Sequence, residues 1–156
     1  MSDIVKIIVT SERHMSAFGE RLAKNLTAGD TVLLSGPIGA GKTHLARAVI
    51  LALLAQPEDI PSPTYTLVQT YANATTEIWH ADLYRLGDSS ELVELGLDEA
   101  MERAIVLIEW PDRLPAEMVP NNALAIDFVP VAETRVLNIA SSSDRWHGIL
   151  AEFSNV

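Results

Sequence analysis

The chain has 156 residues, 48% hydrophobic and 21% charged, which is typical of one globular domain over residues 1–156. Its formal net charge of −10 argues against direct, non-specific binding to a nucleic-acid backbone, which needs clustered Lys and Arg. The absence of cysteine excludes disulfides and thiolate metal sites. No apolar run approaches the roughly 18 residues of a membrane span, and the first residues lack a secretory signal pattern. We therefore expect a soluble, cytoplasmic protein that meets nucleic acid, if at all, through a partner.

Local patterns predict alternating strands and helices in the first half of the chain. The apolar run at 31–36 lacks the alternation of a half-exposed strand, so we expect burial on both faces, as in a parallel sheet. Two β-type runs joined by a polar turn predict a hairpin, and Asp88 or Ser89 is expected to cap the helix that follows. In chain order, the predicted elements are strand 4–10, helix 11–26, strand 31–36, helix 44–55, hairpin strands 65–71 and 75–86, short helices within 88–101, strand 104–110, strands 123–129 and 134–140, and helix 144–153.

A glycine-rich loop, GPIGAGKT, lies between the strand at 31–36 and the helix at 44–55 and matches the pattern G-x-x-x-x-G-K-[ST]. Glycines let the backbone bring its amides close to phosphate oxygens, and the helix N-terminus adds a positive dipole end. A chance match in a glycine-rich turn is the alternative, but the buried strand before the loop and the helix after it favour a phosphate site. Its predicted nucleotide-binding residues are Gly36, Pro37, Ile38, Gly39, Ala40, Gly41, Lys42 and Thr43.

Within this loop, Lys42 is expected to reach the β and γ phosphates and the Thr43 hydroxyl to bind Mg²⁺. Such a site needs a second, acidic element at the end of a neighbouring apolar strand. Glu109, after the apolar run AIVLI, is the best candidate, and Asp82 in HADLYRL is the second. The alternatives are a strand-end residue turned to solvent for Glu109 and a turn cap for Asp82.

Four further features allow two interpretations each. The segment 62–64 (SPT) is either a switch that senses the γ-phosphate or an extended loop imposed by prolines. His80 lacks a His or Cys at ligand spacing, which favours a structural or orienting role over metal ligation. Trp110 and Trp146 are expected to pack in the fold, with stacking on a nucleobase as the alternative, and an exposed Trp110 would also suit a partner contact.

The motifs GPIGAGKT, SPTYTLVQTY, HADLYRL, ELGLDEAM and IEWPDRLP occur in an order and spacing that resemble the bacterial tRNA threonylcarbamoyladenosine biosynthesis ATPase family, TsaE (formerly YjeE). The resemblance extends from the first strand to about Arg135, and no motif of the family is recognised after Ala140. Together with the element order, it implies a P-loop NTPase-like α/β fold, a three-layer sandwich around a mixed, mostly parallel sheet with an antiparallel hairpin.

The resemblance also implies a function. Members of this family are Mg²⁺-dependent ATP hydrolases, weak alone, that support modification of the adenosine next to the anticodon in tRNAs reading ANN codons. The implied partners are the TsaD transferase and TsaB, with ATP hydrolysis resetting that complex between turnovers. The implied cofactors are ATP or ADP and Mg²⁺, and tRNA is reached only through the complex.

Several roles transfer from the family to matching positions of this chain. The resemblance places Mg²⁺ on Thr43 and Glu109 and an essential acidic residue, near the γ-phosphate or its water, on Asp82. Which of the two carboxylates positions the attacking water stays open. More weakly, it places Ser11, or Thr10 before it, and Arg135 along the nucleotide.

One position departs from the family pattern. Pro37 and Ile38 stand where the family commonly has Asp-Leu, from which we expect altered loop stiffness and intact chemistry.

Three other functions also use a phosphate loop. A small-molecule P-loop kinase would need paired lid arginines, whereas the relevant stretch offers only Arg85 and Arg103, singly. A regulatory GTPase would need an N-K-x-D motif, which the sequence lacks. A nucleotide-gated binding module with incidental hydrolysis is the non-enzymatic alternative.

Overall fold

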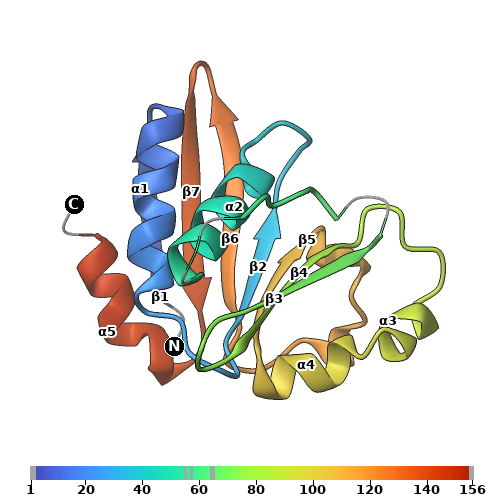
Figure 1. Cartoon of the computed structure of the whole chain (residues 1–156). Coiled ribbons are helices and arrows are strands. Elements are labelled where there is room, and N and C mark those ends of the chain that lie inside the picture. The colour runs from blue at the N-terminus through green and yellow to red at the C-terminus, as the bar shows by residue number, and fades with distance from the viewer. Residues whose placement is uncertain (1–2, 55, 57, 64–65, 155–156) are drawn as a thin grey trace.

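The computed structural model describes residues 3–54, 56, 58–63 and 66–154. Its helices and strands follow the predicted order (Figure 1). They are β1 (Asp3–Val9), α1 (Glu12–Ala23), β2 (Thr31–Ser35), α2 (Lys42–Leu53), β3 (Val68–Ala72), β4 (Glu77–Asp82), α3 (Ser90–Glu94), α4 (Leu97–Arg103), β5 (Ile105–Glu109), the 3₁₀ turns η1 (Pro111–Arg113) and η2 (Ala116–Met118), β6 (Leu124–Val131), β7 (Thr134–Ser141) and α5 (Asp144–Phe153).

The strands form one sheet of seven in the order β1-β7-β6-β2-β5-β4-β3. β2 lies parallel to both β5 and β6, and β4 lies parallel to β5. The other pairs are antiparallel: β1 with β7, β6 with β7, and β3 with β4. The predicted mixed sheet with its hairpin is confirmed, and the β6–β7 hairpin makes the opposite side of the sheet antiparallel as well.

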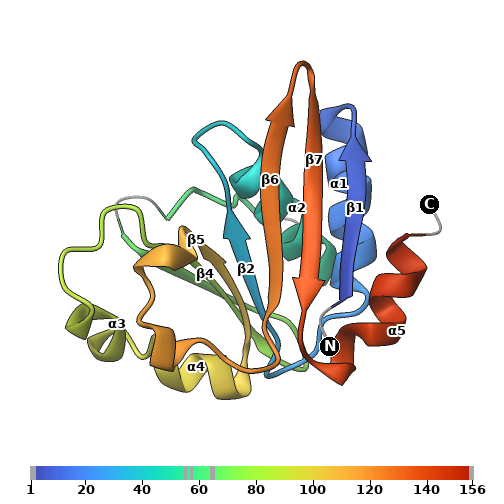
Figure 2. The same ribbon diagram turned by 180° about the vertical axis from the view of Figure 1, so that it is seen from behind.

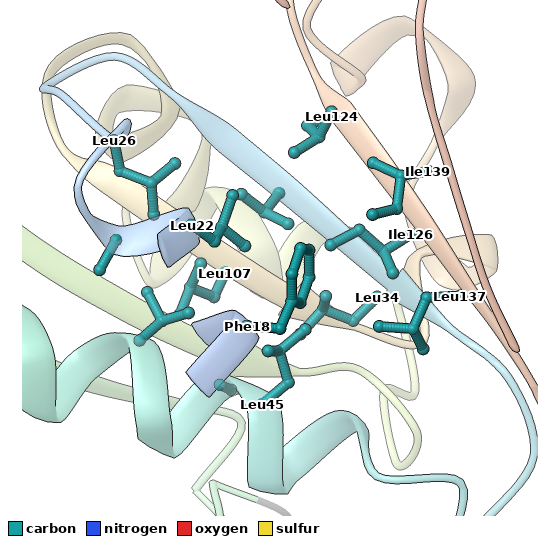
Figure 3. Close-up of a cluster of buried hydrophobic side chains, with 14 of the residues drawn as sticks. Phe18, Leu22, Leu26, Leu34, Leu45, Leu107, Leu124, Ile126, Leu137 and Ile139 are labelled. Carbon is teal, nitrogen blue, oxygen red and sulfur yellow. The ribbon is translucent and has the colours of Figure 1, made fainter. Parts of the chain in front are cut away.

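Two layers of helices bury the two faces of this sheet. α1, α2 and α5 lie over one face, where Phe18, Leu45 and Leu107 meet in a cluster drawn in Figure 3. α3 and α4 lie over the other face, where Trp79 and Val106 pack beneath them. Figure 2 shows the sheet from behind, with β6, β7 and β1 in front of α1 and α2. This is the expected three-layer arrangement.

β2 lies inside the sheet, with Val32 and Leu34 buried on one face and, on the other, Thr31 buried and Leu33 half-buried, close to the burial that the run at 31–36 predicted. β5, beside β2, and β4, the next strand along, end in the buried residues Glu109 and Asp82, which are paired in register. The carboxyl ends of β2, β5 and β4 therefore meet at one edge of the sheet, the place where open α/β sheets bind ligands. We call this the loop edge.

Several predicted boundaries differ from the structure; for example, α2 begins at Lys42 instead of residue 44, and β4 ends at Asp82 instead of residue 86. Helix α1 ends at Ala23, three residues before the expected end, because the amides of Asn25 and Leu26 bond to the carbonyls three residues back and tighten the last turn. Leu26 is nevertheless buried. β3 begins at Val68, whereas the predicted start at Tyr65 lies outside the described residues.

The residues before α3 share the capping of that helix. Ser89 is the N-cap of α3 but makes no side-chain capping bond, while the Asp88 carboxylate accepts from the Ser90 amide at 3.0 Å. Among the described residues, no helix has the length and apolar character that crossing a membrane requires.

Candidate nucleotide site

The loop between β2 and α2 is shaped by two glycines. Gly36 has φ 142° and Gly41 has φ 105°, in a region that side chains rarely adopt. A Cβ at Gly36 would lie 2.7 Å from the carbonyl oxygen of Phe128 on β6, so the loop can leave the sheet here only without a side chain. Gly41 is the N-cap of α2 and has no side chain to cap the first turn, whose amides face the loop edge.

Lys42 begins α2 and is only 4% exposed. Its ammonium donates a hydrogen bond to the carbonyl oxygen of Gly36 and lies 3.5 Å from the ring centroid of Trp110. Burial lowers the pKa of this ammonium from its ordinary value, and the nearby carboxylates of Glu109 and Asp82 oppose the shift. A cation held this way lies where it can bind phosphate oxygens.

Glu109 ends β5 beside the first turn of α2 and is 2% exposed. Its Oε1 accepts a hydrogen bond from the Thr43 hydroxyl at 2.7 Å, and its Oε2 lies 2.7 Å from Nε2 of His80. The side chain therefore points into the site, which excludes the alternative of a strand-end residue turned to solvent. Thr43 and Glu109, the two residues expected to share a metal, are in direct contact.

Asp82 ends β4 and lies in register with Glu109. Its Oδ1 accepts from the Tyr84 amide at 3.0 Å, so the turn-capping interpretation is also correct. The carboxylate nevertheless faces the same hollow as Lys42 and Glu109, a cavity of about 450 Å³. That cavity is lined by Ile38, Gly39, Gly41, Lys42, Thr43, His44, Asp82, Tyr84, Arg85, Glu109 and Trp110.

A second hollow, of about 280 Å³, lies on the other side of the loop. Ser11 and Arg135 both line it, together with Gly39 and Gly41, which line the first cavity as well. Ser11 is the N-cap of α1 and accepts from the His14 amide at 3.0 Å, while Arg135 donates to the carbonyl of Gly39 at 3.4 Å. The structure thus places these two residues along the loop, on the side away from Glu109.

The other residues singled out from the sequence lie in the outer loop, in an irregular segment and in the core. Pro37 and Ile38 lie at the outer part of the loop, with Ile38 74% exposed. Ser62 and Pro63 lie in an irregular segment, and Thr64 is outside the described residues. Trp146 is fully buried and donates to the Asn122 carbonyl, so its packing role is confirmed.

Two contacts of the site were missed by sequence reasoning. The rings of Tyr84 and Trp110 pack against each other with centroids 4.8 Å apart and planes tilted by 47°, and the ring of Trp110 covers Lys42. Trp110 has φ 59° and ψ 54°, an uncommon conformation for a bulky residue that turns the chain sharply after β5. The proline after Trp110 indicated a turn, but nothing in the sequence indicated that the Trp110 ring would lie over Lys42.

The loop, the strand before it and the carboxylate of the neighbouring strand define a P-loop NTPase-like fold. The solved structure of Bacillus subtilis YdiB has the same arrangement, with a TM-score of 0.78 over 99% of this chain and 96% of that one, at 21% identity. The predicted fold class is confirmed.

Sequence comparisons define the family. The family described as "Threonylcarbamoyl adenosine biosynthesis protein TsaE" matches residues 9–137. Proteins called tRNA threonylcarbamoyladenosine biosynthesis protein TsaE are similar to this chain at 38% identity in Rickettsia felis (73% of this chain, 67% of that protein) and 37% in Rickettsia bellii (77% and 86%). A Mycobacterium bovis protein of the same name is 37% identical over 76% of both chains. The chain belongs to the TsaE family, as the motifs predicted.

Proposed function

We propose that this protein is a Mg²⁺-dependent ATP hydrolase that supports threonylcarbamoylation of tRNA. The observation that best supports hydrolysis is the contact between Thr43 and Glu109, 2.7 Å apart at the end of the phosphate loop and the start of α2. Lys42 is buried beside the same pair. In P-loop nucleotidases, catalysis depends on positioning and on charges aimed at the transferred phosphoryl group, and these three residues supply both.

The chemistry of the donors suits magnesium. Thr43 offers a hydroxyl oxygen and Glu109 a carboxylate oxygen, the hard ligands that Mg²⁺ prefers. Within the described part of the chain, no three His, Cys, Asp or Glu side chains gather into a metal site. An ion held by Thr43 and Glu109 would therefore complete its shell with phosphate oxygens and water, as Mg²⁺ commonly does, and would neutralise phosphate charge.

The two carboxylates are assigned different roles. Both oxygens of Glu109 are engaged by the hydroxyl of Thr43 and the ring of His80, which fixes the carboxylate for the metal. Asp82 lies one strand further away, in the wall of the same cavity. We assign it to orient the attacking water near the γ-phosphate. Ser11 and Arg135, in the hollow across the loop, would contact the nucleoside end.

The partners proposed are the TsaD transferase and TsaB, with ATP hydrolysis resetting their complex between turnovers. A net charge of −10 favours reaching tRNA through such partners instead of through direct contact. The kinase alternative is disfavoured because only one of its two arginines, Arg85, lines the cavity. Arg103 instead pairs with Glu77, at 3.0 Å.

The test is steady-state ATP hydrolysis by the purified protein, alone and with TsaB, TsaD and tRNA, measured alongside tRNA modification. We expect slow hydrolysis that rises with the partners, and multiple-turnover modification that depends on it. Lys42→Ala is the matched control, because it removes the ammonium beside the loop and should lose nucleotide binding. Partners that bind nucleotide-loaded protein without accelerating hydrolysis would favour a nucleotide-gated binding module. Acceleration by a small hydroxylated metabolite would favour the kinase.

A contact surface is proposed at the rim of this cavity, where Ile38 and Tyr84 are exposed beside Trp110. Exposed apolar side chains next to a nucleotide site suit a partner that responds to the nucleotide. Trp110→Ala is expected to weaken binding to the TsaB and TsaD pair in a pull-down or titration. Unchanged binding would remove this surface from consideration.

A further inference from the structure

His80 is a buried histidine beside the proposed metal ligand. It lies on β4, is 0% exposed, and faces Leu107 across the parallel pairing of β4 with β5. Side chains two apart share a face of a strand, so His80 lies on the same face as Asp82, and Leu107 on the same face as Glu109. His80 therefore sits one step inward from the loop edge, behind both carboxylates, on the face that α2 covers.

The contacts of the two ring nitrogens indicate which one donates a hydrogen bond. Nε2 lies 2.7 Å from Oε2 of Glu109, while Nδ1 is buried and has no hydrogen-bond partner among the described residues. A proton on Nδ1 would be a buried donor without an acceptor, which is costly. The arrangement favours a proton on Nε2 that is donated to Glu109.

This bond fixes the orientation of the carboxylate. Thr43 holds Oε1 and the His80 ring holds Oε2, so the terminal torsion of Glu109, otherwise broad, is restricted from both sides. The donors in these two bonds are a hydroxyl and an imidazole, so neither Lys nor Arg occupies the carboxylate oxygens through them. Outer partners of this kind set the direction of a metal ligand.

We infer that His80 is a positioning residue that orients Glu109 to receive a divalent cation bound with the nucleotide. The inference rests on the proposed function for the role of Glu109, but it concerns a residue that does not line the cavity. It assigns to His80 no metal contact and no proton transfer.

The experiment compares three substitutions at one position. His80→Gln keeps an N–H at about the reach of Nε2, His80→Asn keeps an N–H nearer the position of Nδ1, and His80→Leu removes the donor at similar volume. The readout is Mn²⁺ binding in the presence of ADP, followed by electron paramagnetic resonance, together with metal-free ADP binding and the thermal unfolding midpoint.

We expect His80→Leu and His80→Asn to weaken Mn²⁺ binding on the order of tenfold and to leave metal-free ADP binding unchanged, while His80→Gln restores most of the affinity. Wild-type Mn²⁺ affinity in His80→Leu would overturn the inference. So would equal loss in all three variants accompanied by weaker metal-free ADP binding, because that pattern marks a packing role.

A second measurement tests the hydrogen bond without metal or nucleotide. Nitrogen-15 NMR of the imidazole should show the Nε2-protonated ring, and Glu109→Gln should change the Nε2 resonance. A proton on Nδ1, or a resonance insensitive to Glu109→Gln, would overturn the inference. If wild-type protein hydrolyses no ATP with its partners while Mn²⁺ affinity still follows the His80 series, the proposed function fails and the positioning role stands.

Discussion

Two carboxylates at opposite edges of the sheet, Glu109 and Asp30, are each 2% exposed and have different partners. Asp30 precedes β2 and is paired with Arg145. The Nε of Arg145 donates to Oδ1 of Asp30 at 3.1 Å, and its Nη2 donates to Oδ2 at 2.5 Å. The amide of Thr27 also donates to it, at 2.8 Å. Glu109, at the loop edge, accepts instead from a hydroxyl and an imidazole.

Because the two carboxylates are equally buried and differ in their hydrogen-bond donors, burial by itself does not identify a functional carboxylate. The charge of Asp30 is neutralised by a guanidinium within the fold, so the pair is complete without a ligand. Glu109 accepts no hydrogen bond from a guanidinium or ammonium of the described residues, and the nearby cation Lys42 is already bonded to a backbone carbonyl. Its negative charge can still attract a metal.

The hollows beside these two carboxylates also differ in the charges of the side chains that line them. A hollow of about 800 Å³ lies beside Asp30, larger than either hollow at the loop, but its wall includes the acidic side chains of Asp98, Glu102 and Glu117. Such a wall repels phosphate. The cavity at the loop edge is smaller and contains Lys42, Arg85 and a helix N-terminus, which attract it. Charge and donors, more than volume, distinguish the candidate site.

The largest expected effect is at the loop edge. Glu109→Ala should lower Mg²⁺-dependent ATP hydrolysis by about a hundredfold or more, because it removes a proposed metal ligand. Part of the nucleotide binding should survive, since Lys42 and the loop remain. Steady-state hydrolysis and ADP titration measure the two effects separately. Full activity in this variant would show that Glu109 does not hold the metal.

An intermediate effect, on stability and not on chemistry, is expected at the opposite edge. Arg145→Ala leaves Asp30 buried without its cation and should lower the free energy of unfolding by about 2 kcal/mol. The figure is below the usual range for buried pairs because a third of the Arg145 side chain is exposed. Urea denaturation measures it, and ATP hydrolysis should stay at the wild-type level. The comparison breaks down if hydrolysis falls as much as in Glu109→Ala.

The smallest effect concerns pH. Burial lowers the pKa of Lys42 below its ordinary 10.5, so the unfolded chain holds the proton more tightly than the folded one. Burying the charged form therefore destabilises the folded state at every pH below the lowered pKa. This destabilisation disappears as the pH rises toward 10.5. Wild-type protein should therefore gain stability relative to Lys42→Met as the pH becomes alkaline, in urea denaturation.

Arg145 provides the matched control for that series. Its hydrogen bond to Asp30 raises the pKa of the guanidinium, which stays charged over the whole range. The difference in unfolding free energy between wild type and Arg145→Ala should therefore be constant while the Lys42→Met difference changes. A constant difference for both would mean that burial does not destabilise the Lys42 charge.

Most of the fold and the position of the phosphate loop could be predicted from the sequence, because they depend on short-range patterns. The apolar run of β2, the glycine spacing of the loop and the periodicity of α2 are all local, and each is encoded in fewer than about twenty consecutive residues. The same holds for Glu109, whose acidic side chain directly follows a buried strand. The motif order also indicated the family correctly.

What only the tertiary structure decided was the pairing of side chains from separate elements. The registers of β4 and β2 against β5 bring His80 and Thr43 to the two oxygens of Glu109, although these residues are 29 and 66 positions away from it. The need for glycine at Gly36 comes from the backbone of β6, far along the chain. Strand register and helix packing set such contacts through long-range burial, which no local pattern records.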